Sequence, residues 1–361
     1  MSQLFTPVRV GRLTLQNRLV MAPMTRSRSD DEGTPSDLVT LYYAQRASAG
    51  LIITEGVFPS AMGKGYVRTP GIETDAQVAA WKKVTEAVHA NGGRIFMQLM
   101  HCGRISHPSL LPNDAQPVAP SAIKPAGQTW TDSGLQDFVT PRELSLDEIA
   151  GVIDDYRMAT RRALAAGFDG VELHTASGYL PEQFLSSGSN QRQDQYGGSV
   201  ANRARFVLEV LGAMVAEAGG DRVGIKISPE MGFNDIVDAN PQETYTYLVE
   251  QLGDLNLAYL HVALFGAKVD YHALLGPRFN GTYLIGGGLD QTGAEAALAD
   301  GRADATVFGS AFLANPDLPD RFRQGAPLNT PDKNTFYSPG AQGYTDYPIL
   351  SGTGAYQGMP S

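Results

Sequence analysis

The sequence predicts an α/β fold in which eight parallel strands close into a (β/α)8 TIM barrel. Eight short apolar or β-branched runs recur along the 361 residues, segments with helical periodicity separate them, and no repeat, low-complexity tract or linker divides the chain. Nearly continuous apolar runs are typical of parallel strands covered on both faces, and such strands are usually joined through a helix. The same units can also form a doubly wound open sheet, but closure into a barrel is the preferred prediction.

The strands and helices follow one another in regular alternation. The predicted strands cover residues 19–22, 51–54, 94–97, 170–173, 223–227, 257–260, 282–285 and 305–308. The clearest helix begins after Ser145, whose hydroxyl can accept a hydrogen bond from the backbone N–H of Glu148 while the Glu148 side chain reaches back. Its apolar face carries Ile149, Val152, Ile153, Tyr156, Ala159 and Ala163. Further helices are predicted over residues 75–90, 200–218, 241–253 and 292–299.

Two segments lie outside this alternation. Residues 4–18 contain Gly11 between two short runs, which predicts a β-hairpin lid under the bottom of the barrel. Residues 102–144 are rich in Pro, Ser, Gly and Asp and follow the third strand, a length typical of a functional lid over the active-site face. We therefore predict one domain, residues 1–361, with one long excursion.

Composition excludes several classes of function. The chain contains 28 Lys and Arg and 38 Asp and Glu, which gives a net charge of −10. This negative charge argues against general binding to nucleic acid or to anionic membranes. The single cysteine, Cys102, excludes an internal disulfide, a four-thiolate zinc site and a four-cysteine iron–sulfur cluster. No basic segment leads into an apolar run at the start, and no run approaches the ~18 apolar residues of a membrane span. We expect a cytoplasmic protein with a small-molecule partner; monomer and homo-oligomer both remain open.

Working groups of a TIM barrel lie where the strands end at their carboxyl side. The seventh and eighth strands lead into Gly286-Gly287-Gly288 and Gly309-Ser310, at the place where barrels recurrently bind phosphate. The alternative is an ordinary glycine turn. Because no Gly-x-Gly-x-x-Gly follows a strand, a mononucleotide is preferred over a dinucleotide as the phosphate ligand.

The fourth strand leads into a second candidate region. His174 and Ser177 can both donate to one carbonyl oxygen, and Tyr179 offers a phenolic proton nearby. A structural histidine and a packing tyrosine are the alternative interpretation. His101 and His107 are better explained by hydrogen bonding than by metal binding, since no carboxylate stands near them in sequence, and no metal site is predicted.

Several motifs resemble the Old Yellow Enzyme family, from residue 4 to residue 350. The most specific lies between Gln191 and Arg203. The matching segments are Leu4-Phe5-Thr6-Pro7, Asn17-Arg18, Ala22-Pro23-Met24-Thr25-Arg26, Gln98-Leu99 with His101, Gly103-Arg104-Ile105-Ser106-His107, Gln183-Phe184-Leu185, Ser189-Asn190-Gln191-Arg192, Asp194-Gln195-Tyr196-Gly197-Gly198-Ser199, Asn202-Arg203, Ala314-Asn315-Pro316-Asp317-Leu318 and Gly343-Tyr344-Thr345-Asp346-Tyr347-Pro348.

The resemblance implies noncovalent FMN, reduced by NADPH or NADH, which then passes hydride to an activated alkene. It implies that Thr25 contacts the O4 edge of the flavin, that Gln98 forms hydrogen bonds to the pyrimidine ring, and that Gly56 lies behind that ring. The full set of implied cofactor residues is Pro23, Met24, Thr25, Gly56, Gln98, Lys226, Gly287, Gly288, Gly309 and Ser310. Tyr179 is implied as the proton donor, His174 and Ser177 as the carbonyl-binding pair, and Tyr66, Met100 and Tyr337 as further substrate contacts.

Three positions depart from the family pattern. Ser177 replaces the usual Asn or His and is a shorter donor. Lys226 replaces an arginine and keeps its charge without its planar fork. Ser310 replaces the phosphate-binding arginine, which removes a charge-assisted hydrogen bond and predicts weaker retention of FMN.

The leading functional hypothesis is an FMN-dependent ene-reductase that acts on α,β-unsaturated carbonyl or nitro compounds. One alternative is reduction of nitrate esters or nitroaromatics, which does not need the Tyr179 proton. Others are an FMN- or phosphate-binding barrel with weakened turnover, and a non-flavin aldolase or isomerase that uses the same phosphate site.

Overall fold

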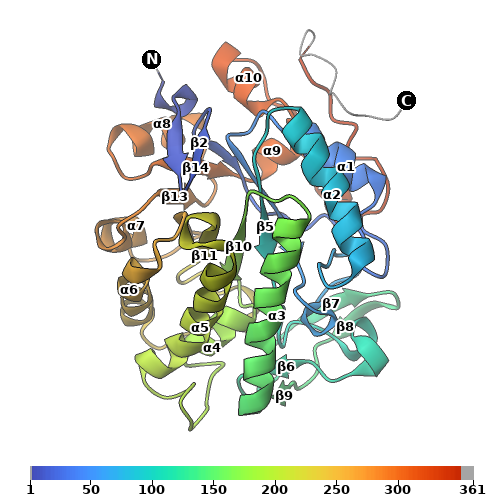
Figure 1. The fold of residues 1–361 in the computed structure, drawn as a ribbon, viewed down its shortest axis with the longest axis vertical. Helices are drawn as coiled ribbons and strands as arrows, with labels where there is room; N and C mark the ends of the chain where they lie inside the picture. The colour runs from blue at the N-terminus through green and yellow to red at the C-terminus, as the bar shows by residue number, and fades with distance from the viewer. Residues whose placement is uncertain (1, 351–361) are drawn as a thin grey trace.

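The computed structural model describes residues 2–350, and eight parallel strands close into a barrel at its centre (Figure 1). The strands pair in the closed order β10-β11-β12-β13-β14-β3-β4-β5, so the predicted barrel is confirmed and the open sheet is excluded. Their bounds are β3 (Leu19–Met21), β4 (Leu51–Val57), β5 (Ile95–Leu99), β10 (Gly170–Thr175), β11 (Val223–Ile227), β12 (Tyr259–Ala263), β13 (Tyr283–Gly286) and β14 (Ala305–Phe308). The prediction of a single domain up to residue 361 includes residues 1 and 351–361, which lie outside the described part.

Helices surround the barrel (Figure 1). They are α1 (Asp37–Ala44), α2 (Asp75–Ala90), α3 (Leu146–Ala165), α4 (Leu180–Leu185), α5 (Val200–Ala218), α6 (Pro241–Gln251), α7 (Tyr271–Leu275), α8 (Gln291–Ala299), α9 (Ser310–Ala314) and α10 (Leu318–Gln324). The predicted capping box of α3 is present: the Ser145 hydroxyl accepts from the Glu148 N–H, and the Glu148 carboxylate accepts from the Ser145 N–H. The helix then buries its apolar stripe, including Ile149 and Tyr156, against the barrel.

Some predicted boundaries were wrong. Strand β4 does not end at Thr54 but continues to Val57 through an irregularity between Ile53 and Gly56, because the polar Glu55 is itself buried. Strand β12 lies two to three residues further along than predicted. The short helix α9, which was not among the predicted helices, begins directly at Ser310.

A hairpin of β1 (Val8–Val10) and β2 (Leu13–Leu15) lies against the amino-terminal ends of the barrel strands. Gly11 turns the hairpin with φ +55°, and a Cβ there would lie 2.0 Å from the carbonyl oxygen of Asp221. Val10 and Leu15 are buried with apolar residues that begin β4 and β14. The hairpin therefore packs against this end of the barrel interior.

The segment 102–144 lies at the opposite end of the molecule in Figure 1 and contains four short strands. Strands β6 (Val118–Ala119) and β9 (Arg142–Glu143) pair in parallel, and β7 (Gln128–Thr131) and β8 (Gly134–Asp137) form a hairpin. Phe138 is buried in a small cluster with Met100 and Tyr179, so the excursion contacts two predicted site residues.

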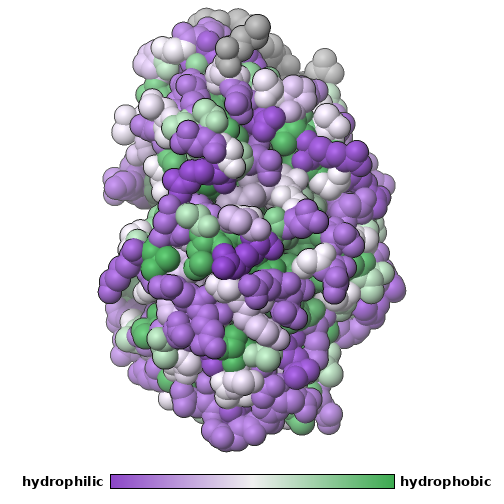
Figure 2. Space-filling view, turned by 90° about the vertical axis from the view of Figure 1, so that its left-hand side faces the viewer, coloured by the Kyte–Doolittle hydropathy of each residue, from purple (hydrophilic) through white to green (hydrophobic). Residues whose placement is uncertain are grey.

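The face that carries α6, α7 and α8 presents mainly hydrophilic side chains, with apolar groups scattered among them (Figure 2). No helix within residues 2–350 is long and apolar enough to cross a membrane.

Candidate active site

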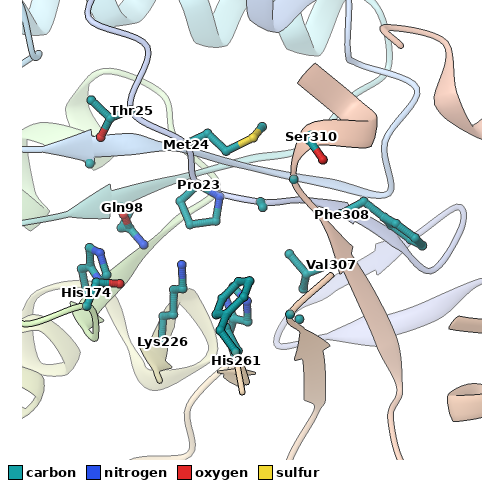
Figure 3. A pocket seen from close by; sticks show the side chains of 18 of the residues that line it. Pro23, Met24, Thr25, Gln98, His174, Lys226, His261, Val307, Phe308 and Ser310 are labelled. Carbon is teal, nitrogen blue, oxygen red and sulfur yellow. The ribbon is translucent and has the colours of Figure 1, made fainter. Parts of the chain in front are cut away.

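A cavity of about 470 Å³ opens at the carboxyl ends of the strands. Of the predicted site residues, Tyr66 alone is not on its wall. The wall includes Pro23, Met24, Thr25, Gly56, Gln98, Met100, His174, Ser177, Tyr179, Lys226, Gly287, Gly288, Gly309, Ser310 and Tyr337. In Figure 3, Gln98, His174, Lys226 and His261 extend from the strands toward the segment Pro23-Met24-Thr25, and Ser310 lies at the other end. The structure thus brings together residues separated by up to 314 positions, from Pro23 to Tyr337, while their individual roles stay predictions.

Three nitrogen-bearing side chains form a row across neighbouring strands. His174 of β10 pairs in register with Lys226 of β11, and Lys226 pairs with His261 of β12. Burial lowers the pKa of His174 well below its usual value, and the nearby Lys226 and His261 lower it further. Burial also lowers the pKa of Lys226. His174 is therefore neutral around pH 7, and its ring has one N–H to donate.

A buried carboxylate supports this row. Glu172 accepts a hydrogen bond from Gln98 Nε2 at 2.7 Å, and its other oxygen lies 3.1 Å from His261 Nδ1. Glu172 and His261 are almost completely inaccessible to solvent. Because Gln98 gives this amide N–H to Glu172, its amide orientation is fixed, with the carbonyl oxygen left to accept from a ligand.

Tyr179 stands directly beside His174. Their ring centroids are 5.0 Å apart in an edge-to-face arrangement, and the Tyr179 hydroxyl lies 2.9 Å from the hydroxyl of Tyr66. Burial raises the pKa of Tyr179 well above its usual value, so the phenol keeps its proton. Tyr66 is part of a second hollow described below.

The turn between His174 and Tyr179 is held by the first residues of α4. The Gly178 N–H donates to the Glu182 carboxylate at 2.6 Å, and Gln183 Nε2 donates to the Gly178 carbonyl at 2.8 Å. Tyr245 also donates to Glu182, whose pKa burial raises to about 7. This support fixes the backbone that presents Tyr179.

Ser177 adopts a left-handed backbone conformation, with φ +59°. Its hydroxyl lies 3.5 Å from the sulfur of Met231, and its carbonyl accepts from Asn234 Nδ2. The side chain is on the cavity wall but is engaged with a thioether, a weak acceptor. The predicted second carbonyl donor is thus shorter than an asparagine and is also turned toward another group.

The far end of the cavity is neutral. Gly287 has φ +118°, and a Cβ there would lie 2.0 Å from the carbonyl oxygen of Leu264, whereas Gly288 faces open space. Gly309 leads into α9, whose first residue is Ser310. Among the described residues, Lys226 supplies the only lysine or arginine side chain on the cavity wall, and it lies at the other end.

Sequence reasoning missed several wall residues. His261 was missed because the sixth strand was predicted to end at Leu260, whereas β12 continues to Ala263 and includes His261. Phe265 and Phe336 also line the cavity but lie in loops, and Phe233 lies in a three-residue 3-10 helix; periodicity carries no information in such segments. No group of three potential metal ligands occurs in the described part of the chain.

Comparison with known proteins shows which family the chain belongs to. Residues 3–329 match the NADH:flavin oxidoreductase / NADH oxidase family. The chain belongs to the Old Yellow Enzyme family. Within it, the chain is 46% identical over 358 residues to a protein named putative 12-oxophytodienoate reductase 3 from Oryza sativa subsp. japonica, covering 96% of this chain and 92% of that protein.

Solved structures of the Old Yellow Enzyme family superpose closely on the chain. Morphinone reductase matches with a TM-score of 0.94 and 48% identity over 99% of both chains. The Old Yellow Enzyme homologue from Zymomonas mobilis matches with a TM-score of 0.93 and 40% identity over 96% of this chain and all of that one. The chain is therefore a flavin oxidoreductase with noncovalent FMN and a nicotinamide dinucleotide as reductant.

The cavity fits this cofactor. One end offers the Gln98 carbonyl and the Lys226 amine, which makes no hydrogen bond to any described residue and suits the electron-rich edge of a flavin ring. At Gly56 a Cβ would lie 2.5 Å from the Met100 sulfur, so the missing side chain keeps this wall thin. The other end offers glycine backbone and the Ser310 hydroxyl for a phosphate.

Proposed function

We propose that the protein is an ene-reductase that reduces the C=C bond of α,β-unsaturated carbonyl or nitro compounds. The observation that carries this proposal is the contact between His174 and Tyr179, whose rings are 5.0 Å apart on the wall of the cavity. In an enone, a single carbon separates the carbonyl oxygen from the α-carbon. A hydrogen-bond donor for the oxygen and a proton donor for the α-carbon must therefore stand side by side, as these two residues do.

His174 acts on the substrate oxygen. Addition of hydride to the β-carbon builds negative charge on that oxygen, and a donor that is already in place lowers the barrier. His174 Nδ1 is buried and has no hydrogen-bond partner among the described residues, so the protein leaves this polar atom unsatisfied. The neutral imidazole polarises the oxygen by donating a hydrogen bond, without transferring its proton.

Tyr179 supplies the proton. Its hydroxyl is held by Tyr66 at 2.9 Å, and its raised pKa keeps it protonated until charge develops on the α-carbon. The cofactor, once reduced by NADH or NADPH, supplies hydride. In this arrangement Gln98 and Lys226 would hold the flavin ring together with Pro23, Met24 and Thr25, and Gly287, Gly288, Gly309 and Ser310 would hold its phosphate.

Separate measurement of the two half-reactions tests the proposal. The purified yellow protein is bleached with NADPH under anaerobic conditions and then mixed with cyclohexenone, and flavin absorbance is followed in each step. Reoxidation by cyclohexenone, with formation of cyclohexanone, is the expected result. A flavin that is reduced by NADPH but is not reoxidised by enones, imides or nitroalkenes contradicts the proposal.

A further inference from the structure

A second hollow of about 560 Å³ adjoins the cavity. The two share Thr25, Tyr179, Phe233 and Tyr337, so the two hollows meet along these four residues. We call the cavity with His174 the inner cavity and the second hollow the outer chamber. Trp130 and Tyr337 line the outer chamber with 60% and 62% of their surface exposed, so both offer aromatic faces to a ligand.

Arg68 is the one charged side chain among the described residues that line the outer chamber. Its Nε donates to the carbonyl of Ser27 and its Nη2 to the carbonyl of Tyr337, each at 3.1 Å. It makes no ion pair with a carboxylate of the described residues, although the chain carries a net charge of −10. The arginine is thus fixed in place and keeps its charge uncompensated.

The backbone of Arg68 adopts a left-handed conformation. Its φ is +52°, a conformation that costs a residue with a side chain about 1 kcal/mol or more. The Arg68 carbonyl accepts from the Ser29 N–H at 3.1 Å, which helps to hold this geometry. With two of its N–H groups on backbone carbonyls, the guanidinium presents Nη1 for a further acceptor, and a fixed donor loses less entropy on binding than a free one.

We propose that Arg68 and the outer chamber form a subsite for an oxyanion on the arm of a ligand whose reacting ring lies in the inner cavity. The inference rests on the proposed function, because it takes the inner cavity as the place of reaction. Either a phosphate or a carboxylate can accept a charge-assisted hydrogen bond from the Arg68 guanidinium. Two sources fit: the phosphates of the nicotinamide dinucleotide, and a carboxylate on the chain of an unsaturated substrate.

Matched ligand pairs test the subsite by affinity. One pair is tetrahydroNAD and the corresponding tetrahydronicotinamide riboside, which keeps the ring and lacks the phosphates. The other is a cyclopentenone with a carboxyalkyl chain and its primary amide. Dissociation constants for the FMN-loaded protein are measured by calorimetry for the natural chain, Arg68→Gln and Arg68→Lys. Lys333→Gln is the control, because it removes an exposed cation outside the chamber.

Arg68→Gln is expected to weaken binding of the anionic member of at least one pair by about tenfold or more, since hydrogen bonds to charged groups are the stronger kind. Neutral members and the Lys333→Gln control are expected to stay within about twofold of the natural chain. Raising the salt concentration to about 0.5 M is expected to weaken binding of the anionic member to the natural chain. This salt dependence is expected to be lost in Arg68→Gln and kept in Arg68→Lys. The pair that responds identifies the source of the oxyanion.

Two results overturn the subsite. One is unchanged affinity for both anionic ligands in Arg68→Gln. The other is an equal loss for neutral and anionic members, which would show that Arg68 acts only by holding Ser27 and Tyr337. Turnover of cyclohexenone by the natural chain is measured in parallel, because its absence contradicts the proposed function while the affinity comparison still decides the subsite.

Discussion

The two ends of the inner cavity carry different groups, and in the proposed function one end holds the flavin ring and the other holds its phosphate. At the ring end, His174, Lys226 and His261 form a row of nitrogen-bearing side chains above the buried Glu172. At the phosphate end, Gly288, Gly309 and Ser310 offer backbone and one hydroxyl, without a lysine or arginine among the described wall residues. Ionisable side chains are therefore concentrated at the ring end, and the described wall residues at the phosphate end carry no charge.

This difference predicts how each end responds to substitution. Side chains at the ring end act through protons and developing charge, so their removal is expected to change rates. Groups at the phosphate end act through binding, so changes there are expected to alter the retention of FMN and leave the chemical step alone. Four substitutions test that division, taken from the largest expected effect to the smallest.

Tyr179→Phe is expected to slow reoxidation of the flavin by cyclohexenone by about 10²–10⁴-fold, the usual contribution of a general acid. Reduction by NADPH needs no proton from this residue and is expected to stay near its natural rate. Stopped-flow absorbance measures both steps. Equal slowing of the two steps would remove Tyr179 from its proposed role. Reduction of a nitrate ester that survives the substitution would identify a second activity that does not need this proton.

His174→Ala is expected to lower kcat/KM for cyclohexenone by about 10²–10³-fold, as for other single donors to a developing oxyanion. Because burial and the nearby Lys226 and His261 hold the pKa of His174 well below 6.5, the residue does not titrate near neutral pH. A profile of kcat/KM against pH should therefore show no loss that follows an acid with a pKa near 6.5. Harmless removal of the imidazole would contradict a neutral donor.

Much of the fold follows from sequence because its signals are local. Strands β11 and β14 and helices α2 and α5 have the predicted bounds, since an apolar run or a helical period defines each of them. Strand β4 was predicted too short because Glu55 and Gly56 read as a strand end. In the structure Glu55 is buried and accepts from the N–H of Arg26 and the hydroxyl of Tyr43, partners that are distant in sequence.

The site shows the same limit. The rule that barrel sites lie at strand ends, with the family resemblance, led to residues that the structure places on one cavity wall, with the exception of Tyr66. Orientation could not be predicted, because it depends on neighbours that only the fold supplies. The Ser177 hydroxyl lies against Met231, 54 positions away, and the Arg68 guanidinium is fixed by the carbonyl of Tyr337, 269 positions away.

Ser310→Arg tests the neutral end. An arginine beside the phosphate adds a charge-assisted hydrogen bond worth roughly 1.5–3 kcal/mol, so the dissociation constant of FMN is expected to fall about tenfold or more. Riboflavin lacks the phosphate, and its affinity is expected not to change. Fluorescence titration of the apoprotein with both flavins provides the measurement. Unchanged FMN affinity would show that another group already supplies the missing charge.

Ser177→Asn has the smallest expected effect of the four substitutions, and it lies at the ring end of the cavity. An asparagine extends its amide one bond further than serine extends its hydroxyl, and asparagine tolerates the left-handed conformation that Ser177 adopts at φ +59°. The serine hydroxyl lies 3.5 Å from the Met231 sulfur, so its loss removes only a weak contact. A second donor within about 3 Å of the substrate oxygen adds to the stabilisation that His174 provides.

We expect Ser177→Asn to raise kcat/KM for cyclohexenone by up to about tenfold, a part of the 3–4 kcal/mol that one well-placed donor contributes at most. Ser177→Ala is the matched control, because it removes the hydroxyl without adding an amide, and little change is expected. The competing interpretation is that the small side chain makes room for large substrates. It predicts that Ser177→Asn loses activity on bulky enones and gains none on cyclohexenone. Measuring kcat/KM for a small and a large enone in both variants distinguishes the two interpretations. If the asparagine amide completes the donor pair, Ser177→Asn must accelerate reduction of the small enone, even if it excludes the large one.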